Sequence, residues 1–352
     1  MHDYPWRRLE EMPRACGASL GTARMRVTAD DFQVDEELGF EPDGDGEHLL
    51  VHARKRDTNT TWLAGKLARL AGIPARDVSF AGLKDRHAVT TQWFSLRLAG
   101  RPEPDWTALD AGPVELLGVY RHRHKLRRGE LRGNRFRIVL RDVSADRAAL
   151  EARLQQLQTD GMPNYFGEQR FGRDYQNLDR FGELFGGGRS QRIDRQLRGL
   201  LISAVRSQLF NEVLAQRIGR GSWTSPLAGD YFMLDGSRSG FPDDPGDPHL
   251  AARCFQQDIH PTGPLWGRGR PQVDGETAQL EHETLAPFGE WRERLEHVGL
   301  AQERRPLRVR LNDLQWRFED ATSLSLAFFL PAGTYATALL RELMTLQVPT
   351  PE

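Results

Sequence analysis

The most informative part of the sequence is residues 79–94, which read SFAGLKDRHAVTTQWF. An apolar run that favours a strand lies at each end of a loop, and in that loop Asp85 stands between Lys84 and Arg86. Two neighbouring cations favour the charged form of a carboxylate, and an ionised carboxylate can act as a nucleophile. A surface turn with a local ion pair is the alternative reading of the same residues.

Length and composition indicate a water-soluble protein. At ~150 residues per domain, 352 residues predict two domains. No apolar run approaches the ~20 residues of a membrane helix, and the N-terminal segment lacks the apolar core of a secretory signal. The two cysteines, Cys16 and Cys254, cannot form a disulfide framework or a metal cage by themselves. We therefore expect a cytoplasmic protein that does not enter the membrane.

The charge is unevenly distributed although the net charge is −1. Between residues 121 and 137 eight basic residues face one acid, Glu130. The basic residues are Arg121, Arg123, Lys125, Arg127, Arg128, Arg132, Arg135 and Arg137. Such a stretch is typical of contact with nucleic-acid phosphates, and a solvated loop face is the alternative.

Two strand-rich parts of the chain flank a helical part. Strands are expected at 48–53, 93–98 and 136–140 and again from residue 307, and helices at 60–72, 144–161, 197–213 and 335–343. Residues 221–272 are rich in Gly, Pro and Asp and predict a loop-heavy region. This order predicts an α+β domain that is interrupted by an insertion.

Five segments resemble, in the same order, the motifs of the TruD family, which isomerises uridine 13 of transfer RNA to pseudouridine. They are residues 31–36, 79–94, 132–136, 163–172 and 329–337. The resemblance implies a pseudouridine synthase core with a mixed or antiparallel sheet, formed by residues 1–158 and 306–352. It also implies an inserted α+β domain at 159–305 that selects the RNA.

The resemblance implies roles for seven residues. Asp85 is the nucleophile, and the substrate-binding residues are Phe32, Asn134, Tyr335, Phe136, Lys84 and Arg26. Arg26 stands where family members carry lysine and would pair with Asp85. The aromatic residues would hold a flipped base, and Asn134 would bind the uracil edge. On local grounds alone Phe32 and Phe136 are core residues of strands, and Asn134 is a turn residue after Gly133.

The implied reaction is an isomerisation, which needs neither redox chemistry nor energy input. We therefore expect no cofactor, nucleotide or metal, and a monomer whose partner is tRNA. Addition of Asp85 to C1′ of the ribose, addition to C6 of the base and a glycal route all remain open. A non-catalytic RNA-binding or RNA-folding protein is the main alternative. A glycoside or nucleoside hydrolase would need a second carboxylate, for which Glu36 and Glu168 lie in matched segments.

Overall fold

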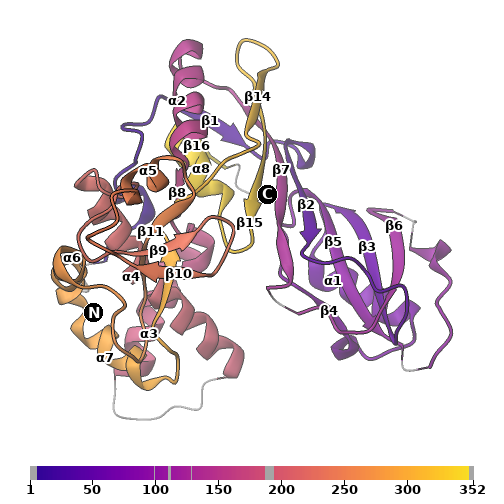
Figure 1. Cartoon of the computed structure of the whole chain (residues 1–352). Helices are drawn as coiled ribbons and strands as arrows, with labels where there is room; N and C mark the ends of the chain where they lie inside the picture. Colours follow the sequence, from indigo (N-terminus) through magenta and orange to yellow (C-terminus); the bar gives the residue numbers. More distant parts are fainter. Residues whose placement is uncertain (1–5, 99, 110–111, 128, 187–193, 349–352) are drawn as a thin grey trace. The chain divides into compact units, whose positions relative to one another are not determined.

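The computed structural model describes residues 6–98, 100–109, 112–127, 129–186 and 194–348 (Figure 1). These residues form two compact units. The sheet unit comprises the described residues of Leu20–Arg147, Leu311–Gly333 and Met344–Glu352. The helical unit comprises those of Met1–Ser19, Ala148–Arg310 and Thr334–Leu343.

A mixed sheet of ten strands, drawn from both ends of the chain, forms the sheet unit. The strands are β1 (Thr22–Met25), β2 (Phe32–Leu38), β3 (His48–Arg56), β4 (Val78–Phe80), β5 (Val89–Arg97), β6 (Val114–His122), β7 (Leu131–Arg141), β14 (Gln315–Phe318), β15 (Leu324–Pro331) and β16 (Thr345–Gln347). The order β14-β15-β7-β2-β5-β3-β6 forms the main path, with β1 beside β7, β16 beside β1, and β4 beside β5. The β2–β5 and β1–β16 pairs are parallel. The predicted α+β class with a mixed sheet is confirmed.

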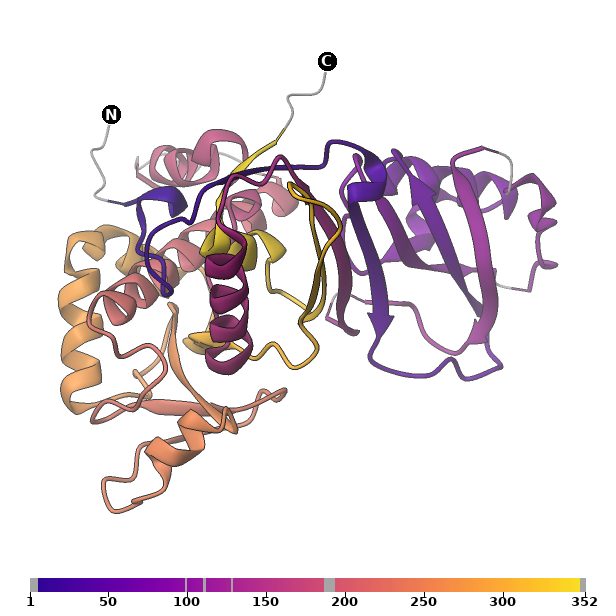
Figure 2. The ribbon, with the colours of Figure 1, turned by 90° about the horizontal axis from the view of Figure 1, so that it is seen from above.

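Buried side chains at alternating positions of the strands form the core of the sheet unit. In β7 Phe136, Ile138 and Leu140 are buried, as their alternation with arginines predicts. The helix α1 (Thr60–Leu70) buries Leu63 and Leu67 in a cluster with apolar residues of β3 and β5. In Figure 2 the indigo and purple strands of the sheet run side by side.

The helical unit contains seven helices, six strands and the segments that join them within the described residues. The helices are α2 (Arg147–Asp160), whose first residue belongs to the sheet unit, α3 (Gln176–Gly186), α4 (Arg195–Gly219), α5 (Leu250–Phe255), α6 (Gly275–Leu285), α7 (Gly289–His297) and α8 (Ala336–Leu343). The strands are β8 (Met162–Pro163), β9 (Tyr231–Leu234), β10 (Gly240–Pro242), β11 (Ile259–Leu265), β12 (Glu303–Pro306) and β13 (Arg308–Val309). The order β10-β9-β11-β12 forms an antiparallel sheet, and β8 pairs with β13.

Some elements differ from the sequence-based expectations. The predicted helix after Ser144 begins at Arg147, because the Ser144 hydroxyl instead accepts a hydrogen bond from the Thr22 N–H at 2.8 Å. The region 221–272, predicted as loop, contains β9, β10, α5 and β11. These strands are short, and β10 and β11 contain Gly and Pro, so composition alone hid them. A buried ion pair fixes this region, since Arg217 donates to both carboxylate oxygens of Asp230 at 3.0 and 2.9 Å.

The division at residues 159 and 305, which assigns RNA selection to the insertion, stays a prediction. In the described parts of the chain no helix is both long and apolar enough to cross a membrane.

Candidate active site

Asp85 lies in the loop between β4 and β5 and is held by an arginine from a distant part of the sequence. The Arg26 Nη2 donates to Asp85 Oδ2 at 2.7 Å. The side chain of Asp85 is 35% exposed, whereas that of Arg26 is 16% exposed. The guanidinium of Arg26 also lies over the ring of Phe32, with its central carbon 4.2 Å from the ring centroid. The cation is thus fixed on two sides, while the carboxylate stays accessible.

Lys84 does not hold the carboxylate of its sequence neighbour. Its Nζ lies 2.6 Å from Glu36 Oε1 and donates to Asn134 Oδ1 at 2.9 Å. Among the described residues, the ion-pair partner of Asp85 is Arg26, and neither Lys84 nor Arg86 is close enough to form an ion pair with it. The structure therefore shows the Arg26–Asp85 pair that the family resemblance implies, between residues 59 positions apart, and not the local ion pair of the alternative reading.

Glu36 supports this network from inside the sheet. Its side chain has no exposed surface, and its Oε2 accepts a hydrogen bond from the Trp93 N–H at 2.9 Å. Burial raises the pKa of Glu36, while the neighbouring charge of Lys84 lowers it. A carboxylate enclosed in this way orients Lys84 rather than meeting a substrate.

Lys55 is a site residue that the sequence reading missed. It is fully buried in β3, and its Nζ donates to the backbone carbonyl oxygen of Asp85 at 2.9 Å. Lys55 continues the inward series of Leu49, Val51 and Ala53, so a charged residue at a core position of an alternating strand was the available signal. The contact fixes the backbone that carries the candidate nucleophile.

The buried lysine predicts a dependence of stability on pH. Burial lowers the pKa of Lys55 from 10.5 to about 8, so the folded protein loses this proton at a lower pH than the unfolded chain. Between these two values the unfolded chain binds more protons. The contribution of Lys55 to the free energy of unfolding therefore rises with pH, by up to ~1.4 kcal/mol per pH unit. Below the folded-state pKa of about 8, the contribution of Lys55 to the free energy of unfolding no longer changes with pH.

Denaturant unfolding of the wild type and of Lys55→Met at pH 7, 8, 9 and 10 measures this contribution. The difference between the two proteins removes the effect of other titrating groups. We expect the wild type to gain stability relative to the variant above pH 8. A difference that does not change with pH would contradict the assignment.

Three further predicted residues lie beside this network. Phe32 and Phe136 are 2% and 8% exposed, and Phe136 stacks on Phe328 with ring centroids 5.3 Å apart. Such burial fits the core role that the sequence left open for both. Asn134 lies within β7, where it pairs with Glu36 of β2, so it is not the turn residue that its neighbour Gly133 suggested locally.

Tyr335 belongs to the helical unit, immediately before α8. Its ring lies edge-to-face against Phe166, with centroids 5.9 Å apart, and its hydroxyl accepts a hydrogen bond from Arg170 Nε at 2.9 Å. The structure thus brings six of the seven predicted residues together in the sheet unit and places the seventh in the other unit.

The basic stretch at 121–137 is partly neutralised by acids from other segments. Arg123 pairs with Asp45 at 2.8 Å, and Arg135 pairs with Glu37 at 3.1 Å. Arg128 lies outside the described residues. The sequence shows a single acid within this stretch and so suggested more unpaired positive charge than the structure has. The acids that pair with these arginines come from distant positions in the sequence.

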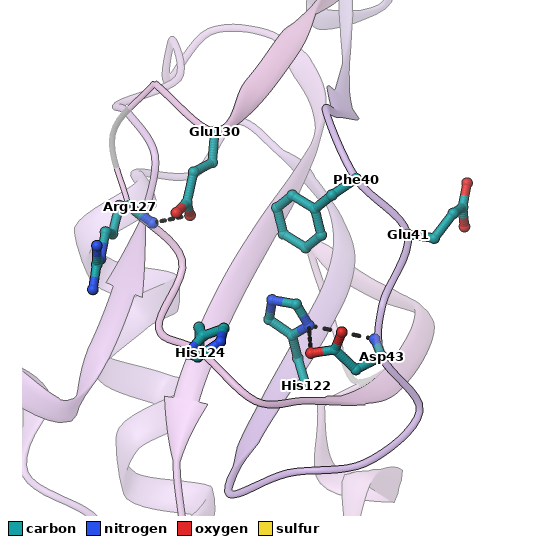
Figure 3. Close-up of a pocket in the computed structure, with 7 residues that line it drawn as sticks. All are labelled: Phe40, Glu41, Asp43, His122, His124, Arg127 and Glu130. Carbon is teal, nitrogen blue, oxygen red and sulfur yellow. Dashed lines mark hydrogen bonds and ion pairs between the residues drawn. The ribbon is translucent and has the colours of Figure 1, made fainter.

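A surface pocket at one end of this stretch contains none of the residues predicted for catalysis. It is lined by Phe40, Glu41, Asp43, His122, His124, Arg127 and Glu130 (Figure 3). His122 stacks on Phe40 with centroids 4.8 Å apart, and its Nδ1 lies 2.8 Å from Asp43 Oδ2. These contacts anchor His122 within the sheet unit.

Comparison with solved structures identifies the fold. A crystal structure from Methanosarcina mazei, provisionally described as a tRNA pseudouridine synthase D, matches 93% of this chain and 94% of its own, with a TM-score of 0.68 and 21% identity. The two chains therefore share the same fold.

Comparison of sequences identifies the family. The model of the family described as tRNA pseudouridine synthase D (TruD) matches residues 17–186 and 187–343. The tRNA pseudouridine synthase D of Nitrosococcus oceani is 51% identical over 330 residues, which cover 93% of this chain and 92% of the relative. That of Methylococcus capsulatus is 49% identical over 335 residues, 95% and 94% of the two chains. The chain belongs to the TruD family.

Proposed function

We propose that this protein isomerises uridine 13 in the D arm of a tRNA to pseudouridine and that Asp85 is the nucleophile. The observation that carries the proposal is the accessible Asp85 carboxylate, which the largely buried Arg26 holds at 2.7 Å. The ion pair fixes the orientation of the carboxylate, while its exposed part remains open to a substrate. The family membership and its relatives support the choice of tRNA as substrate.

The reaction breaks the bond from C1′ of the ribose to N1 of uracil and forms a bond from C1′ to C5. The proton on C5 is lost and N1 gains one, so the reaction needs no oxidant and no energy source. Asp85 adds to C1′ or to C6, or it assists elimination to a glycal. We accordingly propose that no cofactor, nucleotide or metal takes part.

Asn134 is suited to bind the uracil edge. Its Oδ1 accepts a hydrogen bond from Lys84, which Glu36 orients in turn. The amide group therefore presents its N–H donors, and the carbonyl oxygens of uracil are acceptors. A base can meet these donors only after it has been flipped out of its stack. We propose that Tyr335 is an aromatic residue that contacts the substrate RNA, and that the buried Phe136 and Phe32 act from beneath the site, Phe32 by supporting Arg26.

Localisation, oligomeric state and domain roles complete the proposal. We propose that the protein acts as a cytoplasmic monomer and that residues 159–305 select the RNA. A hydrolase is disfavoured by Glu36, because this carboxylate is enclosed and paired with Lys84 whereas the second carboxylate of a glycosidase must reach the substrate. Glu168, the other acid of the matched segments, lies in the helical unit.

Release of tritium from tRNA that carries tritium at C5 of its uridines tests the proposed reaction. We expect tritium release in the presence of EDTA and without added nucleotide, and no free uracil. Free uracil would identify a hydrolase instead. Binding of the tRNA without tritium release would identify the non-catalytic RNA-binding alternative.

A further inference from the structure

Arg170 gathers polar groups of the helical unit around Tyr335. Its Nε donates to the Tyr335 hydroxyl and its Nη1 donates to Ser203 Oγ of α4, both at 2.9 Å. Both partners are neutral, and among the described residues no carboxylate lies within ion-pair distance of Arg170. The guanidinium has five N–H donors, so these two bonds leave further donors for a ligand.

A second guanidinium lies on the same aromatic ring. Arg305 of β12 places its central carbon 4.1 Å from the centroid of Phe166, and Arg170 places its own 5.4 Å from that centroid. Arg305 donates to the backbone carbonyl oxygen of Asn164 at 3.4 Å and to its side-chain Oδ1. Burial is the main cause that lowers the pKa of Arg305 to about 9, and the nearby charge of Arg170 contributes to the same lowering. Two cations are thus held close together where an added anion would be stabilised.

The backbone around this cluster is shaped to bring Tyr335 close. A Cβ at Gly167 would lie 2.9 Å from Cδ1 of the Tyr335 ring and 2.8 Å from Oγ1 of Thr337. Only glycine therefore allows this approach, which places the Tyr335 hydroxyl on Arg170. The segment that carries both glycine and arginine is one of the matched motifs, residues 163–172.

We propose that Arg170 and Arg305, together with the hydroxyl groups of Tyr335 and Ser203, bind a phosphodiester group of the substrate RNA. Guanidinium groups bind phosphate oxygens through paired N–H donors, and hydroxyl groups can donate to the same oxygens. The proposal rests on the proposed function, because it takes the ligand to be the RNA that is modified.

The salt dependence of tRNA binding tests this site in the full-length protein. Each phosphate contact contributes ~0.7–0.9 to the slope of log affinity against log salt concentration. We expect Arg170→Gln to lower the slope by about that amount. Arg253→Gln is the matched control, since it removes one charge from the same unit at a residue that is already paired with Asp258 at 2.6 Å. Its slope should equal that of the wild type.

Arg170→Lys distinguishes loss of the positive charge from loss of the folded structure. It keeps a cation, so we expect most of the slope to return, whereas a variant that had merely lost its structure would not recover. An unchanged slope in Arg170→Gln, or an equal loss in Arg253→Gln, would overturn the proposal.

A second measurement tests anion binding at this site without RNA. Thermal unfolding in inorganic phosphate, with ionic strength held constant by chloride, reports anion binding through a rise in Tm. We expect a rise in the wild type that is smaller in Arg170→Gln. A phosphate effect that depends on Arg170, combined with an unchanged tRNA slope, would show an anion site that RNA does not use and would overturn the proposal. If the salt slopes of tRNA binding are as expected but no pseudouridine forms, the proposed reaction is refuted while the proposed phosphate site is supported.

Discussion

Replacement of Asp85 by asparagine is expected to reduce the turnover of bound tRNA by more than ~10³-fold. The amide keeps the shape of the carboxylate but is not a nucleophile. The affinity for tRNA should change by less than about threefold, because contacts to the phosphate backbone dominate binding. Single-turnover kinetics with saturating enzyme, together with equilibrium binding, measure the two effects separately.

The matched control is Asp142→Asn. Asp142 also pairs with an arginine, Arg24, at 3.1 Å, but its side chain is 63% exposed. Its φ of 52° is a conformation that asparagine adopts readily, so the replacement should fold normally. We expect wild-type turnover in this control. Turnover by Asp85→Asn above a few per cent of the wild type would refute the nucleophile.

Removal of the Arg26 guanidinium is expected to have the second largest effect. Arg26→Ala takes the only ion-pair partner within the described residues away from Asp85 and should lower the single-turnover rate by ~10²–10³-fold, the usual loss when one oriented electrostatic contact is removed from a site. Arg26→Lys keeps a cation over Phe32, and the family resemblance places lysine at this position. We expect it to retain activity within about tenfold of the wild type, because the ammonium keeps the positive charge although the planar guanidinium that donates to Asp85 Oδ2 is lost.

Arg24→Ala is the control for this series, because Arg24 lies two positions earlier, in β1, and pairs with Asp142 at the surface. Exposed pairs of this kind contribute only ~0–1 kcal/mol, so its rate should match that of the wild type. Equal losses in Arg24→Ala and Arg26→Ala would show that the Arg26–Asp85 pair has no special part in the reaction. The same would follow if Arg26→Lys were as slow as Arg26→Ala.

The sheet was predictable where the strands carry enough apolar residues. Strands were predicted around 48–53 and 93–98 and, from alternation with arginines, at 136–140, and these ranges overlap β3, β5 and β7. It could not predict β9 to β11, because strands of only three to seven residues give no clear period, and β10 and β11 also contain Gly and Pro.

The candidate site was predictable in its residues and in one of its contacts. The motif around Asp85 identified the carboxylate, and the resemblance named Arg26 as its partner, whereas the neighbouring cations Lys84 and Arg86 do not pair with it. Arg26 reaches Asp85 because the end of β1 and the loop after β4 meet in the folded sheet unit. Lys84 turns toward Glu36, and Lys55 contacts the Asp85 carbonyl oxygen. Both contacts join residues that are far apart in the sequence, so they depend on the tertiary fold.

Mapping of pseudouridine in a single unmodified tRNA, by carbodiimide treatment and reverse transcription, tests the central claim most directly. The tRNA is incubated with the wild type or with Asp85→Asn and then mapped at every uridine. We predict a new pseudouridine at position 13 with the wild type and none with the variant. Modification at another position alone would contradict the proposed substrate site, and an unmodified tRNA after incubation with the wild type, or equal modification by the variant, would contradict Asp85-dependent isomerisation itself.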